Sequence, residues 1–216
     1  MPPFSAGRVI LTASADPFTR GLDYLYGVRS LALTPDLVDL IDQREGDWRV
    51  PICTWIGQNI DRVNAQLNVY LEACHQCFYA WDAPAVQIFA APLALQAGID
   101  ALCNLETQPI TLLIDVGRVV PEDWLFLVVH EYAHAHARSP GHHQQFARSL
   151  AHLCLGLGIP LPADRGDPQN WLPFYPYCRS TQDPLAFWQG QGEFGRCQPC
   201  ALPTPIANSS GRRAIA

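Results

Sequence analysis

The sequence feature that most constrains the fold is an HExxH motif that follows a strongly apolar stretch. The motif comprises His130, Glu131, Tyr132, Ala133 and His134, and six apolar residues precede it at positions 124–129. In an α-helix of ~3.6 residues per turn, residues four apart lie on one face, so the two histidines are neighbours. Two such imidazoles can bind one zinc ion, and Glu131 can then act as a general base. The motif therefore predicts a helix that carries part of a metal site.

The residues before the motif predict that this helix is buried on all sides. Pro121, Glu122 and Asp123 are typical of a helix start, because proline fits the first turn and acidic groups favour the positive end of the dipole. The apolar stretch leaves no polar face. Because unpaired polar groups are costly inside a protein, the buried histidines and glutamate need a partner. A metal ion is the favoured partner, and a hydrogen-bonded structural cluster is the alternative.

A catalytic zinc usually has three protein ligands, and the third must come from outside the motif. Residues 135–163 contain no Asp or Glu, which disfavours a carboxylate ligand. Four histidines follow the motif instead, namely His136, His142, His143 and His152. His152 lies off the apolar face of the helix predicted at residues 142–157, which favours a surface or hydrogen-bonding role.

The spacing of the other three histidines favours two of them as the third metal ligand. His136 lies about 200° around the helix from His134, so it is expected to point away from the metal. Residues 139–141 read Ser-Pro-Gly, which breaks the helix. The chain can therefore turn back and bring either His142 or His143 to the site.

These residues resemble the SprT-like and WLM-type minimal metallopeptidases. In those families HExxH is followed by a short insert and then by a G/N-H-x-x-x-F/W pattern that opens the next helix. Here the second pattern is Gly141, His142, His143, Gln144, Gln145 and Phe146. Aligned on Phe146, the resemblance implies that the zinc ligands are His130, His134 and His142. It also implies that Glu131 is the general base.

The resemblance covers about residues 110–158. It implies an α+β fold, with a minimal zincin core made of a small sheet, an HExxH active-site helix and a following helix. It also implies hydrolysis of peptide bonds by a metal-activated water. His143 stands where glycine is common in these families. The metzincin spacing is excluded, because a histidine six residues after His134 would fall on Pro140.

Composition and charge exclude several other classes of protein. The chain has 216 residues, 49% hydrophobic and 16% charged, which is enough for one domain with a substantial core. All 14 basic residues are arginine, so neither a P-loop nor a Schiff-base lysine is available. A net charge of −6 does not support binding to nucleic acid. With no convincing signal peptide or membrane span, we expect a cytoplasmic protein.

The eight cysteines allow a second metal site. Cys74 and Cys77 form one CxxC pair, and Cys197 and Cys200 form another, so the four together can bind zinc or the thiols can form a disulfide. Against this, Cys74 continues the apolar face of the helix predicted at residues 54–77 and is expected in the core. The other expected core thiols are Cys53, Cys103 and Cys154.

The pattern along the chain predicts the remaining architecture. We expect an N-terminal segment of unclear role (1–50), a metallopeptidase-like core (51–158), a proline- and aromatic-rich segment across the domain (159–200) and a disordered tail (201–216). Further helices are predicted at 34–41, 54–77 and near 95–105, and strands at 86–90 and 110–116. The strand before the motif helix is expected to lie along the cleft and to pair with an extended peptide.

The favoured function is that of a zinc-dependent peptidase that takes a peptide or protein substrate. The alternative is a non-catalytic zinc-binding interaction module whose cleft is filled by the C-terminal segment. Glu131 favours the enzyme, because a structural zinc site needs ligands but no base. Candidates for stabilising the oxyanion are Tyr175, Tyr177 and Arg138, although packing is the favoured role of the two tyrosines.

Overall fold

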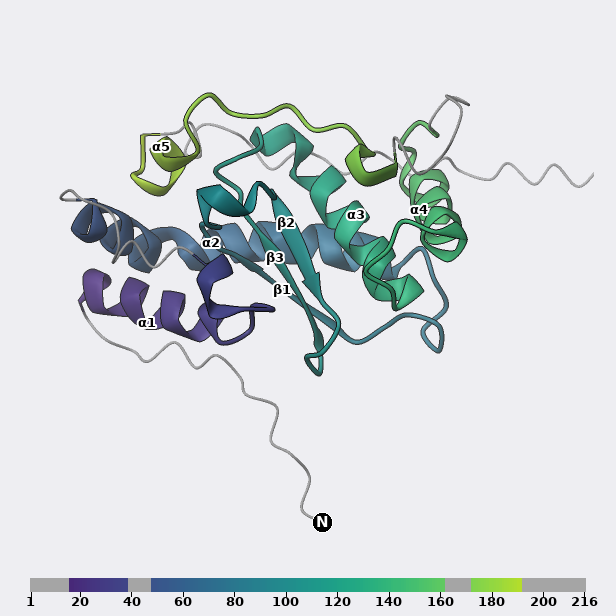
Figure 1. Cartoon of the computed structure of the whole chain (residues 1–216), viewed down its shortest axis with the longest axis horizontal. Coiled ribbons are helices and arrows are strands. Elements are labelled where there is room, and N and C mark those ends of the chain that lie inside the picture. The colour runs from purple at the N-terminus through teal and green to yellow at the C-terminus, as the bar shows by residue number, and fades with distance from the viewer. Residues whose placement is uncertain (1–15, 39–47, 162–171, 192–216) are drawn as a thin grey trace, which may run out of the picture.

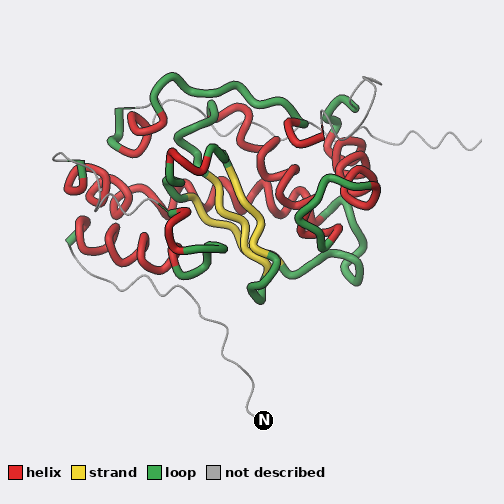
Figure 2. The backbone as a smooth tube through the Cα atoms, in the orientation of Figure 1, coloured by secondary structure: helices red, strands yellow, loops and turns green. Residues whose placement is uncertain are grey.

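The computed structural model describes residues 16–38, 48–161 and 172–191, and it shows helices around a small sheet (Figures 1 and 2). The helices are α1 (Pro17–Arg29), α2 (Arg49–His75), α3 (Trp124–Ala137), α4 (Gln144–Leu157) and α5 (Pro184–Trp188). The strands are β1 (Val86–Ala90), β2 (Ala101–Asn104) and β3 (Ile110–Ile114). Short 3-10 helices are η1 (Pro35–Leu37), η2 (Leu95–Ala97), η3 (Pro121–Asp123) and η5 (Leu172–Phe174). None of the described helices has the length and hydropathy needed to cross a membrane. The predicted α+β class is confirmed.

The sheet is mixed, and its strand order is β1-β3-β2. Strand β1 is parallel to β3, with Val86 opposite Ile110, whereas β2 is antiparallel, with Ala101 opposite Ile114. All residues of β3 are buried, as expected of a central strand. The prediction that the strand before the motif helix pairs with a peptide is therefore wrong, because both edges of β3 already pair with other strands.

Two predicted helices are also wrong in type or length. The segment near 95–105 forms only the η2 turn, which ends at Gly98 with a φ of 63°, and then strand β2. The helix predicted at 34–41 is reduced to η1, because Val38 leaves the helix and forms a bridge with Leu93. Residues 39–41 lie outside the described ranges. In both places pairing with a distant segment overrides the local helical pattern.

Helices α1 and α2 cross closely because each contributes a glycine at the contact. A Cβ on Gly21 would overlap the carbonyl group of Cys53, and a Cβ on Gly57 would overlap that of Pro17. Helix α2 covers one side of the sheet, and it passes behind the strands in Figure 1. Its buried face runs along most of the helix, from Ile52 to Cys74. This face packs against β1 and forms one side of the core.

Side chains from these two helices also close the outer edge of the sheet at the end of β1. The hydroxyl of Tyr24 donates to the carbonyl oxygen of Ala90 at 2.7 Å. The backbone N–H of Ala90 donates to Asn64 Oδ1 at 2.9 Å. Both polar groups of this edge residue are therefore satisfied by side chains. The opposite edge of the described sheet is strand β2.

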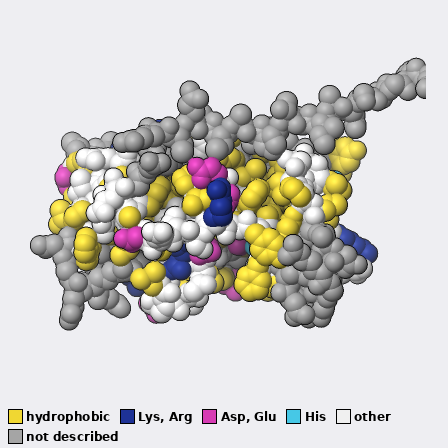
Figure 3. Space-filling model, turned by 90° about the horizontal axis from the view of Figure 1, so that it is seen from above, with side chains coloured by type: hydrophobic (Ala, Val, Ile, Leu, Met, Phe, Trp, Pro, Cys, Tyr) yellow, Lys and Arg dark blue, Asp and Glu magenta, His cyan; other side chains and the backbone are white. Residues whose placement is uncertain are grey.

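The described part of the C-terminal segment, residues 172–191, runs across the top of the molecule in Figure 1. Ser180 forms a bridge with Val119, and Arg179 forms a two-pronged ion pair with Asp123 just before α3. Figure 3 shows that this upper face exposes many hydrophobic side chains. The exposed aromatic residues of the segment include Phe174 at 68% and Tyr177 at 49%.

Buried Asp115, directly after β3, connects the sheet to this C-terminal segment. The residue is 2% exposed. Its carboxylate accepts hydrogen bonds of 2.9–3.1 Å from the backbone N–H groups of Leu93 and Gly117 and from the side chains of Arg118 and Trp188. Arg118 also donates to the carbonyl oxygens of Leu93 and Ala94. One carboxylate thus joins the loop after β1, the turn after β3 and helix α5.

We expect Asp115→Asn to be strongly destabilising. The change removes the negative charge that pairs with the largely buried Arg118. It also replaces one carboxylate oxygen by an NH₂ group, which would face N–H groups that now donate to Asp115. Breaking a buried ion pair on one side costs about 3–5 kcal/mol, and urea unfolding monitored by tryptophan fluorescence would measure the loss. The matched control is Asp36→Asn, at a highly exposed position that should change stability by less than ~0.5 kcal/mol. Equal stability of the two variants would contradict the role of Asp115.

Candidate metal centre

Three histidines converge at the C-terminal half of α3 and the loop that follows it. The nearest ligand atoms of His130, His134 and His142 all lie within 4.8 Å of one another. The Nε2 atoms of His130 and His142 are 3.1 Å apart, close to the ~3.3 Å between two nitrogens bound to one tetrahedral zinc at ~2.0–2.1 Å. Within the described ranges, this is the only group of His, Cys, Asp or Glu side chains close enough to hold a metal ion.

Backbone carbonyl groups orient the two histidines of the motif. Nδ1 of His130 lies 2.8 Å from the carbonyl oxygen of Tyr175, and Nδ1 of His134 lies 2.8 Å from that of Ser139. A carbonyl can only accept, so Nδ1 carries the proton in each ring and Nε2 presents its lone pair. Metal-bound histidines are commonly held in this way. The two rings are therefore arranged as metal ligands.

The loop from 138 to 143 decides which of two adjacent histidines joins the cluster. Helix α3 ends at Ala137, and its C-cap residue Arg138 reverses the chain with a positive φ of 48°. The hydroxyl of Ser139 is hydrogen-bonded to Nε2 of His143 at 2.5 Å and accepts from the N–H of Gly141 at 3.2 Å. His143 is thus held at the exposed side of the loop, while His142 faces His130. The sequence left His142 and His143 as alternatives, and the hydrogen bond of the Ser139 hydroxyl to His143 distinguishes them.

A phenylalanine forms the apolar support of the cluster. Phe146 is fully buried, and its ring centroid lies 4.4–5.0 Å from those of His130, His134 and His142. It belongs to the first turn of α4, on the apolar face that packs against α3. The contact explains why an aromatic residue follows the third histidine at this spacing.

Burial keeps the histidines neutral. Burial, with a smaller contribution from the neighbouring imidazoles, lowers the pKa of His130 and of His134 to about 4. Burial also lowers the pKa of His142. Neutral imidazole is the form that binds a metal. The donor set of three neutral imidazoles fits zinc, and it also suits copper, nickel and iron.

Glu131 lies on the same helix and is buried, with 8% of the residue exposed. Burial raises the pKa of its carboxyl group to about 8, and no described residue offsets this with a hydrogen bond or a positive charge. A divalent cation beside it would act in the opposite direction, since a nearby positive charge favours the carboxylate. Burial, and then the charge of Glu131, raises the pKa of the Cys103 thiol, which indicates that the carboxyl group lies near strand β2.

The other two candidate histidines lie outside the cluster, as the helical spacing predicts. His136 points away from the cluster, stacks on Phe78 at 3.9 Å between centroids and contacts Ser149. His152 is hydrogen-bonded to the carbonyl oxygen of Cys77 at 2.7 Å. Both residues connect α3 or α4 to the segment after α2.

The remaining sequence-based candidates have other roles or fall outside the described residues. The hydroxyl of Tyr175 donates to the carbonyl oxygen of Pro160, and its ring packs edge-on against Tyr177. Cys74 is buried in α2, as predicted, while Cys197 and Cys200 lie outside the described ranges, so the second zinc site stays a prediction. The carbonyl oxygens of Ser139 and Tyr175 were not predicted, because a backbone acceptor leaves no mark on the sequence.

Comparison with protein-family models, with curated proteins and with solved structures gives no match to this chain.

We expect His142→Ala to lower zinc affinity by at least about a hundredfold, because two histidines alone hold zinc poorly. Competition with a chromophoric chelator would measure the change. His136→Ala is the matched control on the opposite side of α3, and it should leave the affinity nearly unchanged. If His143→Ala proves the more damaging variant, His143 rather than His142 is the ligand.

The lowered pKa values predict that zinc binding resists mild acid. Protons compete with the metal at His130 and His134 only as the pH falls toward about 4. We expect the affinity to change less than about tenfold between about pH 7.5 and about pH 5.5. Three histidines with the ordinary pKa of 6.5 would lose about a thousandfold at about pH 5.5. A loss of that size would contradict a buried site that is neutral before the metal binds.

Proposed function

We propose that the protein is a zinc-dependent peptidase with a minimal zincin-like core. The observation that carries the proposal is the convergence of three neutral imidazoles beside a buried glutamate that is placed on the same helix. A structural zinc site needs a fourth protein ligand, whereas three ligands leave one position for water. No fourth His, Cys, Asp or Glu joins the group among the residues that the structure describes.

His130, His134 and His142 would hold the ion through Nε2. Zinc supplies a Lewis acid that polarises a carbonyl group and lowers the pKa of water. The backbone carbonyls of Tyr175 and Ser139 keep the first two rings in the tautomer that binds. Ser139 belongs to the loop before α4, and Tyr175 belongs to the C-terminal segment after α4. Both segments must be in place for the site to keep its shape.

Glu131 is the proposed general base and acid. Its carboxylate would take a proton from the attacking water and pass it to the leaving amine. Because it has no hydrogen-bonding partner among the described residues, the carboxylate is free to accept that proton. Its raised pKa also matches the task, since a group that accepts and then returns a proton works best with a pKa near the working pH.

An extended peptide is the proposed substrate, and β2 is the strand with which it would pair. The N–H of Asp115 bonds to the carbonyl of Asp100, so hydrogen-bonded pairs in this antiparallel ladder fall at every second residue. The N–H and C=O groups of Ala101 and Cys103 therefore point toward the open edge. Cys103 also lies near Glu131. A strand added at this edge would pass beside the base.

We expect Glu131→Gln to abolish peptide cleavage while keeping the zinc and the fold. The change removes the base without removing a ligand, so at least ~10²-fold of the rate should be lost. Hydrolysis of unfolded casein and of a quenched fluorescent peptide library by the zinc-loaded protein gives the readout. Zinc content and thermal melting, measured on the same samples, show whether the site and the fold survive.

Glu106→Gln is the matched control, because it makes the same chemical change at an exposed residue, on the turn just after β2. It should cleave as the wild type does. If wild type and Glu131→Gln prove equally inactive while both bind one zinc, the peptidase proposal fails. The chain is then better described as a zinc-binding interaction module.

A further inference from the structure

An apolar part of the C-terminal segment lies beside the candidate metal centre. We call residues 173–177, which read Pro-Phe-Tyr-Pro-Tyr, the apolar strip. Its middle residue, Tyr175, is 7% exposed, and the carbonyl oxygen of this residue lies 2.8 Å from Nδ1 of His130. Every residue of the apolar strip is therefore within two positions of a group that contacts a proposed metal ligand.

The apolar strip follows the course of helix α3. Tyr175 contacts His130, and four residues later Arg179 donates to the carboxylate of Asp123 through its backbone N–H and its Nε. Asp123 and His130 are seven residues apart, which corresponds to about 10 Å at ~1.5 Å per helical residue. Four extended residues span at most ~13–14 Å. The chain therefore runs along this part of α3, with Tyr177 midway between the two anchors.

Strand β2 approaches the same part of the helix. It contacts α3, and its residue Cys103 lies near Glu131. Burial raises the pKa of the Cys178 thiol, and the charges of Asp123 and Asp100 raise it further. Asp100, the residue before β2, is therefore close to the end of the apolar strip. Strand β2 and the apolar strip both border the metal centre.

Two large rings of the apolar strip are exposed to solvent. Phe174 is 68% exposed and Tyr177 is 49% exposed. The ring of Tyr177 packs edge-on against that of Tyr175, at 5.7 Å between centroids. Residues 172–178 contain no charged side chain. Single exposed apolar residues are common, but a group of them beside a candidate metal centre is typical of a ligand-binding surface.

We propose that Phe174 and Tyr177 bind a large apolar side chain of the substrate, next to the peptide bond that is cleaved. The inference rests on the proposed function, which brings an extended peptide to β2 and its scissile carbonyl group to the metal. Side chains of an extended peptide stand alternately on its two faces, so one set of them can face the apolar strip.

The composition of the apolar strip defines the substrate class. An uncharged aromatic surface favours aromatic and large aliphatic side chains, because their burial is favourable, whereas the burial of an unpaired charge is costly. Folded proteins keep most such side chains inside. The substrate is therefore an unfolded polypeptide, cleaved beside residues such as Phe or Leu.

Four peptides that differ at one residue test this preference. The parent is a short chain of Ala, Ser and Gly with one central Phe, and the others carry Leu, Ser or Glu in its place. Binding is followed by fluorescence anisotropy on zinc-loaded Glu131→Gln, which should hold the metal without consuming the peptide. We expect the Phe and Leu peptides to bind about tenfold or more tightly than the Ser and Glu peptides.

Three variants in the Glu131→Gln background assign the preference to the apolar strip. Phe174→Ala and Tyr177→Ala should each weaken binding of the Phe peptide by about threefold to tenfold and leave the Ser peptide unchanged. Phe174→Arg should reverse the order of the Phe and Glu peptides, because it adds a charge that pairs with Glu. Zinc content and thermal melting are measured on each variant. If Tyr177→Ala loses zinc, the two variants of the more exposed Phe174 decide the test.

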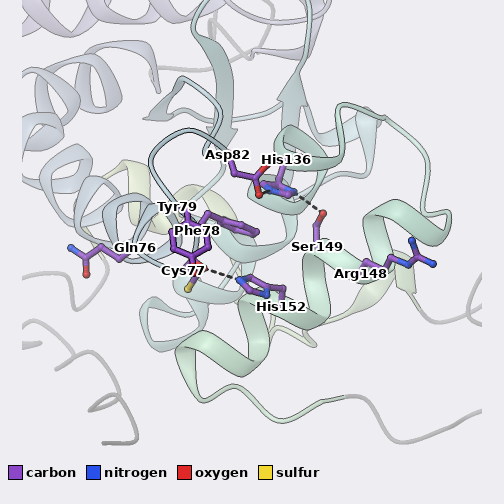
Figure 4. Close-up of a pocket in the computed structure, with 9 residues that line it drawn as sticks. All are labelled: Gln76, Cys77, Phe78, Tyr79, Asp82, His136, Arg148, Ser149 and His152. Atoms are coloured by element: carbon purple, nitrogen blue, oxygen red, sulfur yellow. Dashed lines mark hydrogen bonds and ion pairs between the residues drawn. The ribbon is translucent and has the colours of Figure 1, made fainter. Parts of the chain in front are cut away.

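Matched controls change rings of similar exposure at other places. Tyr79→Ala matches Phe174, since Tyr79 is 70% exposed, and Tyr26→Ala matches Tyr177, since Tyr26 is 48% exposed. Tyr79 lies in the segment after α2, on the side of α3 that carries His136 (Figure 4), and Tyr26 lies on α1. Both controls should bind the four peptides as the Glu131→Gln protein does.

Two results would overturn the inference. One is equal binding of the four peptides by folded, zinc-loaded Glu131→Gln. The other is a preference for Phe that all variants of Phe174 and Tyr177 retain. Cleavage by the wild type without any preference would contradict this inference alone. A preference that depends on these two rings, in a wild type that cleaves nothing, would contradict the proposed function and leave an apolar peptide-binding surface.

Discussion

The buried carboxylate of Asp115 is the interaction on which the arrangement of the other elements depends. It stands where β3 ends, and its four partners come from the loop after β1, the turn after β3 and helix α5. A buried carboxylate without hydrogen-bonding partners costs much free energy. The segments that donate to Asp115 are therefore held in the positions where they satisfy its oxygens. The same turn leads through η3 into α3. The position of the motif helix is thus set by hydrogen bonds to a residue that does not belong to the candidate site.

The candidate metal centre depends on two further segments that the motif itself does not contain. His130 is oriented by a carbonyl group of the C-terminal segment, and His134 by a carbonyl group of the loop after α3. The hydroxyl of Ser139 keeps His143 away and leaves His142 in the cluster. Since the partner of each Nδ1 decides which nitrogen carries the proton, these carbonyls determine whether Nε2 is available to a metal. The centre is therefore assembled by tertiary contacts around a local pair of histidines.

Helix α3 has two polar faces with different surroundings. Residues 130 and 134 face His142 and Phe146, whereas His136 lies beside Asp82 and Ser149. The helical period requires this division, because two residues correspond to about 200° of rotation. The aromatic contact of His136 with Phe78 also ties the helix to the segment after α2. A buried helix with three histidines is stable here because each imidazole has its own polar partner.

The sequence by itself determined the elements whose signals are local. The period of α2, the strand at 86–90, the pairing of His130 with His134 and the outward direction of His136 follow from residue type and spacing alone. The strand predicted at 110–116 is also present, although it ends at Ile114. The short segments at 34–41 and 95–105 could not be predicted, because pairing with Leu93 and with β3 outweighs their weak helical preference. The choice of His142 over His143, the strand order that buries β3, and the carbonyls that orient the imidazoles were decided by the tertiary structure. Each of these depends on backbone groups or on residues far apart in the chain, and such contacts form only when the segments have packed together.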